Sequence, residues 1–88
     1  MPNDSRSSRP DLRFYGEHLV FEPAWGLFYR TSPAGAFLLR ALASGTPAAR
    51  LPGLLAARYR LDESRAARDV ELFLGALRPL ALIPEERL

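Results

Sequence analysis

The feature that most constrains the fold of this chain is a change of hydrophobic period at Ser32-Pro33. Before this point, apolar side chains alternate with others on both sides of Gly16-Glu17, a pattern that predicts short antiparallel strands joined by a tight turn. After it, apolar side chains recur at helical spacing. Serine caps helix N-termini and proline fits the first helical position, so a helix is expected to begin here. The sequence therefore predicts an α+β domain with strands before helices.

Residues 12–31 predict a three-stranded antiparallel meander. The first two strands are expected around residues 12–14 and 19–21, and the Pro- and Gly-containing segment 22–26 should turn the chain again. Residues 27–31 are rich in aromatic and β-branched side chains, which favour a third strand.

Three helices are expected to follow. The first runs from the Ser32 cap to Ser44-Gly45, because glycine readily adopts the left-handed conformation that ends a helix. The second should begin near Leu51 or Pro52, with a short turn over residues 46–50, because a proline inside a helix costs about 3 kcal/mol.

The third helix is expected to be capped by Asp62 or Ser64 and to end before Pro79. The apolar segment from Leu80 to Ile83 should pack back on the domain. The predicted organisation is thus a disordered tail over residues 1–10, one domain over residues 11–83, and a polar tail over residues 84–88.

Composition argues against an enzyme. The 88-residue chain has no cysteine, and its single histidine, His18, has no acid or nucleophile placed to form a site with it, so it is expected on a surface strand. We therefore predict no catalytic residue, no metal site and no cofactor. No apolar run approaches the ~20 residues of a membrane span and no signal peptide is evident, so we expect a cytoplasmic protein without membrane contact.

The charge pattern argues against nucleic acid as a partner. The 12 basic residues nearly balance the 10 acidic ones, giving a net charge of +2, and every basic residue is an arginine. Phosphate-backbone binding usually needs a concentrated basic stripe, whereas the arginines between Arg58 and Arg68 are interrupted by carboxylates. A mixed-sign solvated face is the expected result.

A set of positions spread over residues 12–83 resembles the packing pattern of a known family. These positions are Gly26, Phe28-Tyr29, Ser32, Gly35-Ala36, Leu38, Leu42, Ser44-Gly45-Thr46, Leu51, Leu55, Tyr59, Leu61-Asp62, Asp69-Val70, Phe73-Leu74, Leu77 and Ala81-Leu82-Ile83. In this order and spacing they resemble the PqqD-like domains, the recognition elements of ribosomally made, post-translationally modified peptides. The chain departs from the family pattern at Thr31, Ser32, Pro52 and Ala81, none of which touches a catalytic group.

The resemblance implies a winged helix-turn-helix fold and a non-catalytic function. Stand-alone members, such as the chaperones of the pyrroloquinoline quinone, mycofactocin and lasso-peptide pathways, bind the leader peptide of a precursor as an added strand. They deliver it to a modifying enzyme, such as a radical SAM enzyme or a leader peptidase. The same partners are therefore expected here.

The expected peptide site combines an edge strand with one face of the third helix. An edge strand carries unpaired backbone groups that an extended peptide can satisfy. The residues of this expected site are Leu27, Phe28, Tyr29, Arg30 and Thr31 on the strand, and Arg65, Arg68, Asp69, Leu72 and Ala76 on the helix. Leu72 would contact an apolar leader side chain, and Arg65 and Arg68 would meet acidic groups.

Several of these residues have a second interpretation. Leu72 is equally consistent with a lone exposed leucine, and Asp69 with a surface charge that pairs with Arg65. Phe28 and Tyr29 point to opposite faces of a strand, so one of them packs in the core. Trp25 either caps the sheet or contacts a partner enzyme.

Two other functions share the predicted fold. A winged-helix DNA-binding protein is the main alternative, although a recognition helix should carry Arg, Asn or Gln residues that reach base edges. The chain has no glutamine, and its only asparagine is Asn3. The other is an enzyme subunit that contacts its partner through the apolar segment from Leu80 to Ile83.

Overall fold

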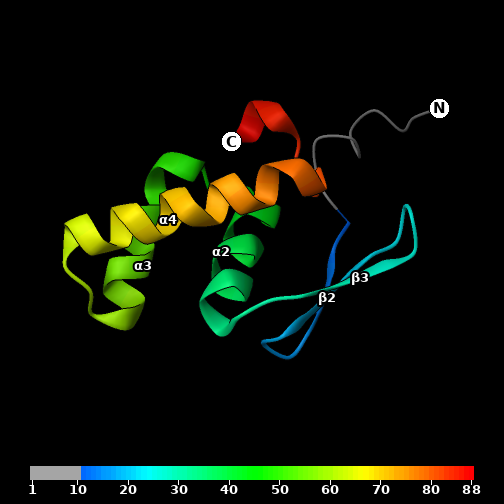
Figure 1. Ribbon diagram of the computed structural model, residues 1–88, viewed down its shortest axis with the longest axis horizontal. Coiled ribbons are helices and arrows are strands. Elements are labelled where there is room, and N and C mark those ends of the chain that lie inside the picture. Colours follow the sequence, from blue (N-terminus) through cyan, green and yellow to red (C-terminus); the bar gives the residue numbers. More distant parts are fainter. Residues whose placement is uncertain (1–10) are drawn as a thin grey trace.

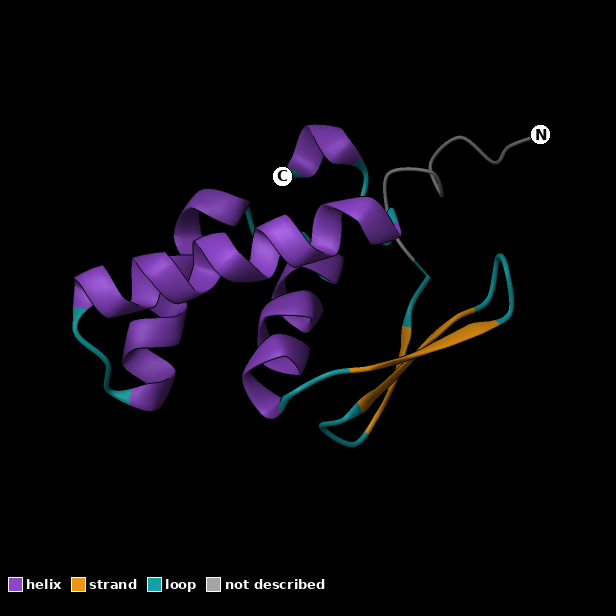
Figure 2. Ribbon diagram, viewed as in Figure 1, coloured by secondary structure: helices purple, strands orange, loops and turns teal. Residues whose placement is uncertain are grey.

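The computed structural model describes residues 11–88, and the predicted disordered tail over residues 1–10 lies outside the described part. The chain forms a small antiparallel sheet followed by three α-helices, which is the predicted α+β order. The sheet lies at one end of the molecule and the helices pack together at the other (Figure 1, Figure 2).

The sheet is the predicted meander. Its strands are β1 (Arg13–Tyr15), β2 (Leu19–Glu22) and β3 (Leu27–Arg30), each antiparallel to the next, in the order β1-β2-β3. Gly26, with φ +69°, provides the left-handed residue of the β2–β3 turn. The prediction that the third strand lies at an edge of the sheet is confirmed.

Helix α2 (Pro33–Ala43) begins as predicted. The hydroxyl of Ser32 accepts a hydrogen bond from the N–H of Gly35 at 3.0 Å, and Pro33 occupies the first turn. The helix buries Leu38, Leu39 and Leu42 against the sheet and the other helices.

Helix α3 (Leu51–Tyr59) also begins where the sequence indicates. A single 3-10 turn, η1 (Ala48–Arg50), precedes it, so Pro52 lies in the first helical turn, where no hydrogen bond is lost. The helix ends at Tyr59 and is followed by Arg60, which adopts a left-handed conformation with φ 56° although it is not glycine.

Helix α4 (Glu63–Leu77) has Asp62 as its cap. One carboxylate oxygen of Asp62 accepts hydrogen bonds from the N–H of Arg65 at 2.8 Å and from the hydroxyl of Ser64 at 3.0 Å. The second cap candidate, Ser64, therefore supports the cap rather than forming it. The helix ends at Leu77, before Pro79 in the 3-10 turn η2 (Arg78–Leu80), as predicted.

The Asp62 cap predicts an acid-sensitive step in stability. The hydrogen bond from the Arg65 N–H, assisted by that from Ser64, holds the pKa of Asp62 below its ordinary value of 3.8. As the pH falls, the unfolded chain therefore binds a proton at Asp62 at a higher pH than the folded chain does. The stability that the ionised Asp62 contributes to the folded state is thus lost as the pH falls below 3.8. We expect the melting temperature of wild type to fall more than that of Asp62→Asn between about pH 5 and pH 2. The asparagine still caps but does not titrate, so parallel curves would contradict the expectation.

The core lies between the inner face of the sheet and the three helices. Val20, Leu42 and Leu51 are its most fully buried large side chains. Leu82 and Ile83 pack on the core at the C-terminal side, as predicted, whereas Leu80 of the same segment is 42% exposed. The last residues also contact the domain. Leu88 packs on the core and the guanidinium of Arg87 donates to the carbonyl of Leu42, because the final 3-10 turn, η3 (Glu85–Arg87), folds the chain back.

Candidate functional site

The free edge of β3 carries backbone groups that the sheet does not use. The N–H of Thr31 donates to the carbonyl of His18 at 2.9 Å, so this pair of opposed residues is a hydrogen-bonded pair. Opposed residues of an antiparallel ladder alternate between bonded and non-bonded pairs. Tyr29 therefore bonds to β2, whereas the N–H and C=O groups of Phe28 and Arg30 point away from it. In the described part of the chain, no strand lies on that side.

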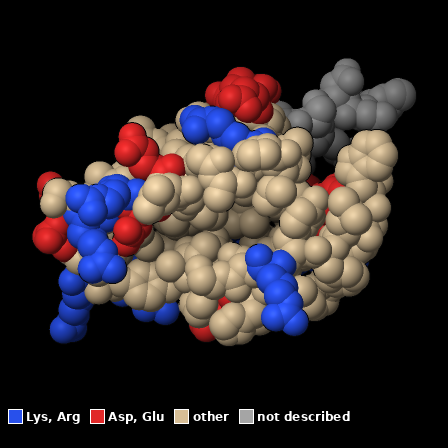
Figure 3. Space-filling model, in the orientation of Figure 1, with Lys and Arg blue, Asp and Glu red and all other residues tan. Residues whose placement is uncertain are grey.

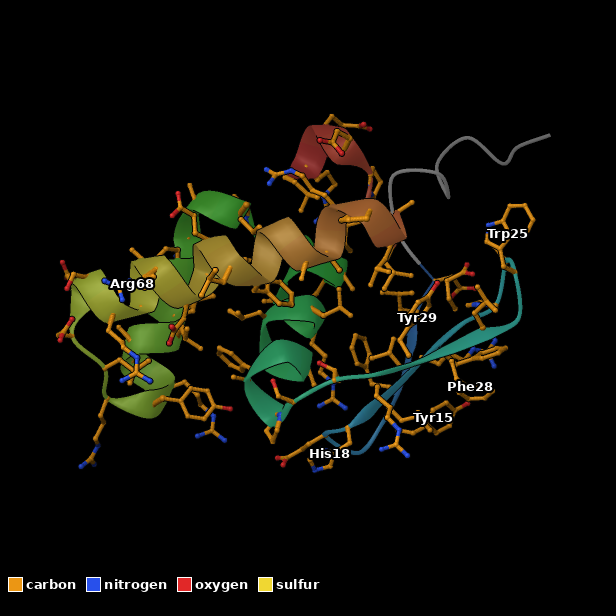
Figure 4. The ribbon with its side chains drawn as sticks, in the orientation of Figure 1. Tyr15, His18, Trp25, Phe28, Tyr29 and Arg68 are labelled. Carbon is orange, nitrogen blue, oxygen red and sulfur yellow. The ribbon has the colours of Figure 1, made fainter. Side chains whose placement is uncertain are left out.

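The side chains of β3 alternate in the same register. Tyr29 lies opposite Val20 on the inner face and packs on the core, whereas Phe28 lies opposite Phe21 on the outer face and is 60% exposed. Figure 4 shows Tyr29 directed toward the helices and Phe28 directed away from them. Of the two aromatic residues, Tyr29 is thus the one that faces the helices.

A hollow of about 150 Å³ lies beside the inner face of β3, between the strand and the C-terminal half of α4. Its walls are mostly apolar, with Tyr29 and Arg30 on the strand side and Phe73 and Ala76 on the helix side. It is lined by Val20, Tyr29, Arg30, Thr31, Leu39, Phe73, Ala76, Leu77, Leu80 and Leu82.

A second hollow of about 390 Å³ continues along the N-terminal half of α4. It lies among the first turn of α2, the end of α3 and α4, and it shares Phe73 with the first hollow. It is lined by Ser32, Ala34, Gly35, Leu38, Leu55, Tyr59, Leu61, Arg65, Asp69, Leu72 and Phe73. We call the two hollows together the α4 groove.

Most of the helix residues predicted for the site line this groove. Arg65, Asp69 and Leu72 line the second hollow, and Ala76 lines the first. Leu72 is 68% exposed, so its side chain is available at the groove wall. The four residues therefore share one face of α4, as their spacing predicts.

Arg68 is the exception among the predicted helix residues. It lines a separate hollow with Pro52, Ala67 and Glu71 rather than the α4 groove (labelled in Figure 4). Arg68 lies one helical turn from both Arg65 and Leu72, but those two residues line the α4 groove and Arg68 does not.

The charges of the groove are concentrated at its outer end. Arg65 and Asp69 form the predicted i,i+4 ion pair at 3.3 Å, and both side chains are partly exposed, so the pair adds only a few tenths of a kcal/mol. Figure 3 shows acidic and basic side chains gathered around the α3–α4 end, with a largely uncharged surface toward the sheet. At the β3 end, Arg30 lines the groove by its position on the strand, whereas the register places its side chain on the outer face of the sheet with Phe28.

Several groove residues carry no signal in the sequence that marks them as functional. Tyr59, Leu61 and Leu80 line the two hollows but carry only the general signal of helical or C-terminal packing. Tyr59 is held by an edge contact with Phe37, with ring centroids 6.1 Å apart, and its ring lies under the guanidinium of Arg58. No local pattern distinguishes such residues from core positions.

Two residues singled out from the sequence lie outside the groove. Trp25 is 82% exposed at the tip of the β2–β3 turn, so the interpretation that it caps the sheet is wrong (Figure 4). The turn is held by the carboxylate of Glu22, which accepts from the N–H groups of Ala24 and Trp25 at 2.9 Å each. His18 is exposed, as expected, but it lies in the β1–β2 turn rather than on a strand. Among residues 11–88, no three His, Cys, Asp or Glu residues are grouped to hold a metal ion.

None of the helices in residues 11–88 combines the length and the apolar character needed to cross a bilayer.

Comparisons with known proteins identify a family but no individual relative. No curated protein and no solved structure matches the chain, so the winged helix-turn-helix class stays a prediction. Residues 17–83 match the family of coenzyme PQQ synthesis protein D, PqqD. This match covers more than half of the 88-residue chain and includes β2, β3 and all three helices, so the chain belongs to the PqqD family.

Proposed function

We propose that this protein is a non-catalytic peptide chaperone. It binds the leader peptide of a ribosomally synthesised precursor by adding it as a strand to β3, and it delivers that precursor to a modifying enzyme. Membership of the PqqD family supports a role in the synthesis of coenzyme PQQ or a related peptide-derived product. The observation that carries the proposal is the open edge of β3 beside the α4 groove.

Backbone pairing would supply the affinity. The N–H and C=O groups of Phe28 and Arg30 are directed at the free edge, and an added strand satisfies all four of them. Each such hydrogen bond contributes about 1 kcal/mol net, whatever the side chains of the peptide. An added strand alone therefore does not select one peptide from another.

The α4 groove would supply the selectivity. Every second side chain of an added strand points to the inner face of the sheet, where the first hollow presents Phe73 and Leu77. Beyond the end of the strand, the peptide meets Leu72 and the ion pair of Arg65 with Asp69. The expected ligand is thus an extended peptide with apolar residues facing the groove and a carboxylate near Arg65.

An NMR titration tests the proposal. The probe is a synthetic peptide with the leader sequence of the precursor encoded beside the gene of this chain, and the control is a scrambled peptide. We expect shifts at residues 27–31 and 65–76, and slower amide exchange at Phe28 and Arg30. Tyr29, whose N–H already bonds to β2, should change less in exchange. Saturating peptide that leaves these signals unmoved, or equal shifts with duplex DNA, would overturn the proposal.

A further inference from the structure

The outer face of the sheet presents six side chains in a regular array. The register places Arg13, Phe21 and Phe28 in one row across the three strands, and Tyr15, Leu19 and Arg30 in the next row. We call these six side chains the outer face. Phe21 and Phe28 stack with ring centroids 4.7 Å apart, so the centre of the array is a continuous apolar surface.

No described part of the chain covers this surface. The helices pack on the opposite face, through Val20, Phe14 and Tyr29. Tyr15 is 52% exposed and Phe28 is 60% exposed, and Figure 4 shows both on the side of the sheet away from the helices. Large aromatic side chains that share one exposed face typically mark an interaction surface.

The charges of the outer face indicate the kind of partner. Arg13 and Arg30 lie at diagonally opposite corners, and none of the six side chains is acidic. The nearest carboxylate along β2, that of Glu22, is engaged by the amides of the β2–β3 turn. A second copy of the same face would bring arginines together without a carboxylate to pair with them. The face instead fits a protein surface with an apolar centre between two carboxylates.

We infer that the outer face is the docking surface for the modifying enzyme; the identity of this partner rests on the proposed function. A peptide added to β3 extends the sheet, so its outward side chains continue the rows of the outer face beside Phe28 and Arg30. An enzyme docked there contacts the chaperone and the bound leader on one continuous surface. The rest of the precursor then leaves the sheet next to the enzyme.

Variants in β1 test this inference separately from leader binding, because β1 lies at the far edge of the sheet from the β3 edge. The full-length chain and the purified modifying enzyme encoded beside it are titrated by calorimetry, with and without the synthetic leader peptide. We expect Arg13→Glu and Tyr15→Ser each to weaken enzyme binding by about tenfold or more. Both should bind the leader peptide as wild type does. Arg50→Glu, the same charge change at an exposed position beside α3, is the matched control and should leave both affinities unchanged.

Each outcome of these titrations has a definite meaning. Unchanged enzyme affinity in both β1 variants, or no enzyme binding by wild type, overturns the inference while leader binding by wild type still stands. A dimer in light scattering that Tyr15→Ser dissociates also overturns it, because the face then binds a second copy. Failure of the leader peptide to bind wild type overturns the proposed function instead, and enzyme binding that the β1 variants weaken would still support the docking surface.

Discussion

Replacing Arg30 by proline should weaken leader binding by about tenfold to a hundredfold while leaving the protein folded. The N–H of Arg30 points to the free edge of β3, so proline removes a donor that only an added strand uses. The proline ring also obstructs the approach of a second backbone at this edge. Fluorescence anisotropy with a labelled leader peptide measures the affinity, and circular dichroism checks the fold.

Two control variants separate the backbone effect from the side chain and from the fold. Arg30→Ala keeps the N–H and should retain most of the affinity, apart from any contact of the guanidinium. Tyr29→Pro removes an N–H that pairs with β2, so this variant should lose stability as well as binding. Equal affinities of wild type and Arg30→Pro would exclude strand addition at β3.

Leu42→Ala should produce the largest loss of stability. Leu42 is fully buried at the centre of the core, where α2 meets the other helices. Removing its side chain costs about 2–5 kcal/mol in lost burial and residual cavity. This is a large share of the roughly 5–15 kcal/mol that stabilises a typical domain. Urea unfolding followed by circular dichroism measures the change, and a loss under about 1 kcal/mol would contradict the burial of Leu42.

Leu72→Ala is the matched control for the same chemical change. Leu72 is also helical but is 68% exposed, so its removal should alter the free energy of unfolding by no more than about 0.5 kcal/mol. Its effect should instead appear as weaker leader binding, since Leu72 lines the α4 groove. A variant with unchanged stability and unchanged leader affinity would identify Leu72 as an ordinary exposed leucine.

The elements of this fold are predictable from the sequence because their boundaries depend on local chemistry. Ser32 and Pro33 fix the start of α2, and the conflict between a helix and Pro52 correctly predicts that α3 begins near Leu51 or Pro52. The edge position of β3 follows from the order of a meander. These signals lie within a few residues of the features that they determine.

The shape of the groove is less predictable because it depends on contacts between distant segments. Helical spacing correctly groups Arg65, Asp69 and Leu72 but does not reveal that the neighbouring Arg68 lines a separate hollow. Tyr59 has the same spacing signal as a core residue, and its place in the groove depends on how α3 ends against α4. These positions are set by how the helices pack against one another. The hydrophobic periodicity of a single helix does not show how it packs against its neighbours.

The exposed Trp25 gives this protein a built-in optical reporter. It is the only tryptophan of the chain, and it stands at the hairpin tip that leads directly into β3. An indole in contact with water emits at longer wavelength than one covered by protein. A blue shift of the intrinsic fluorescence therefore follows any event that covers the hairpin tip, and iodide quenching reports the same event without a label.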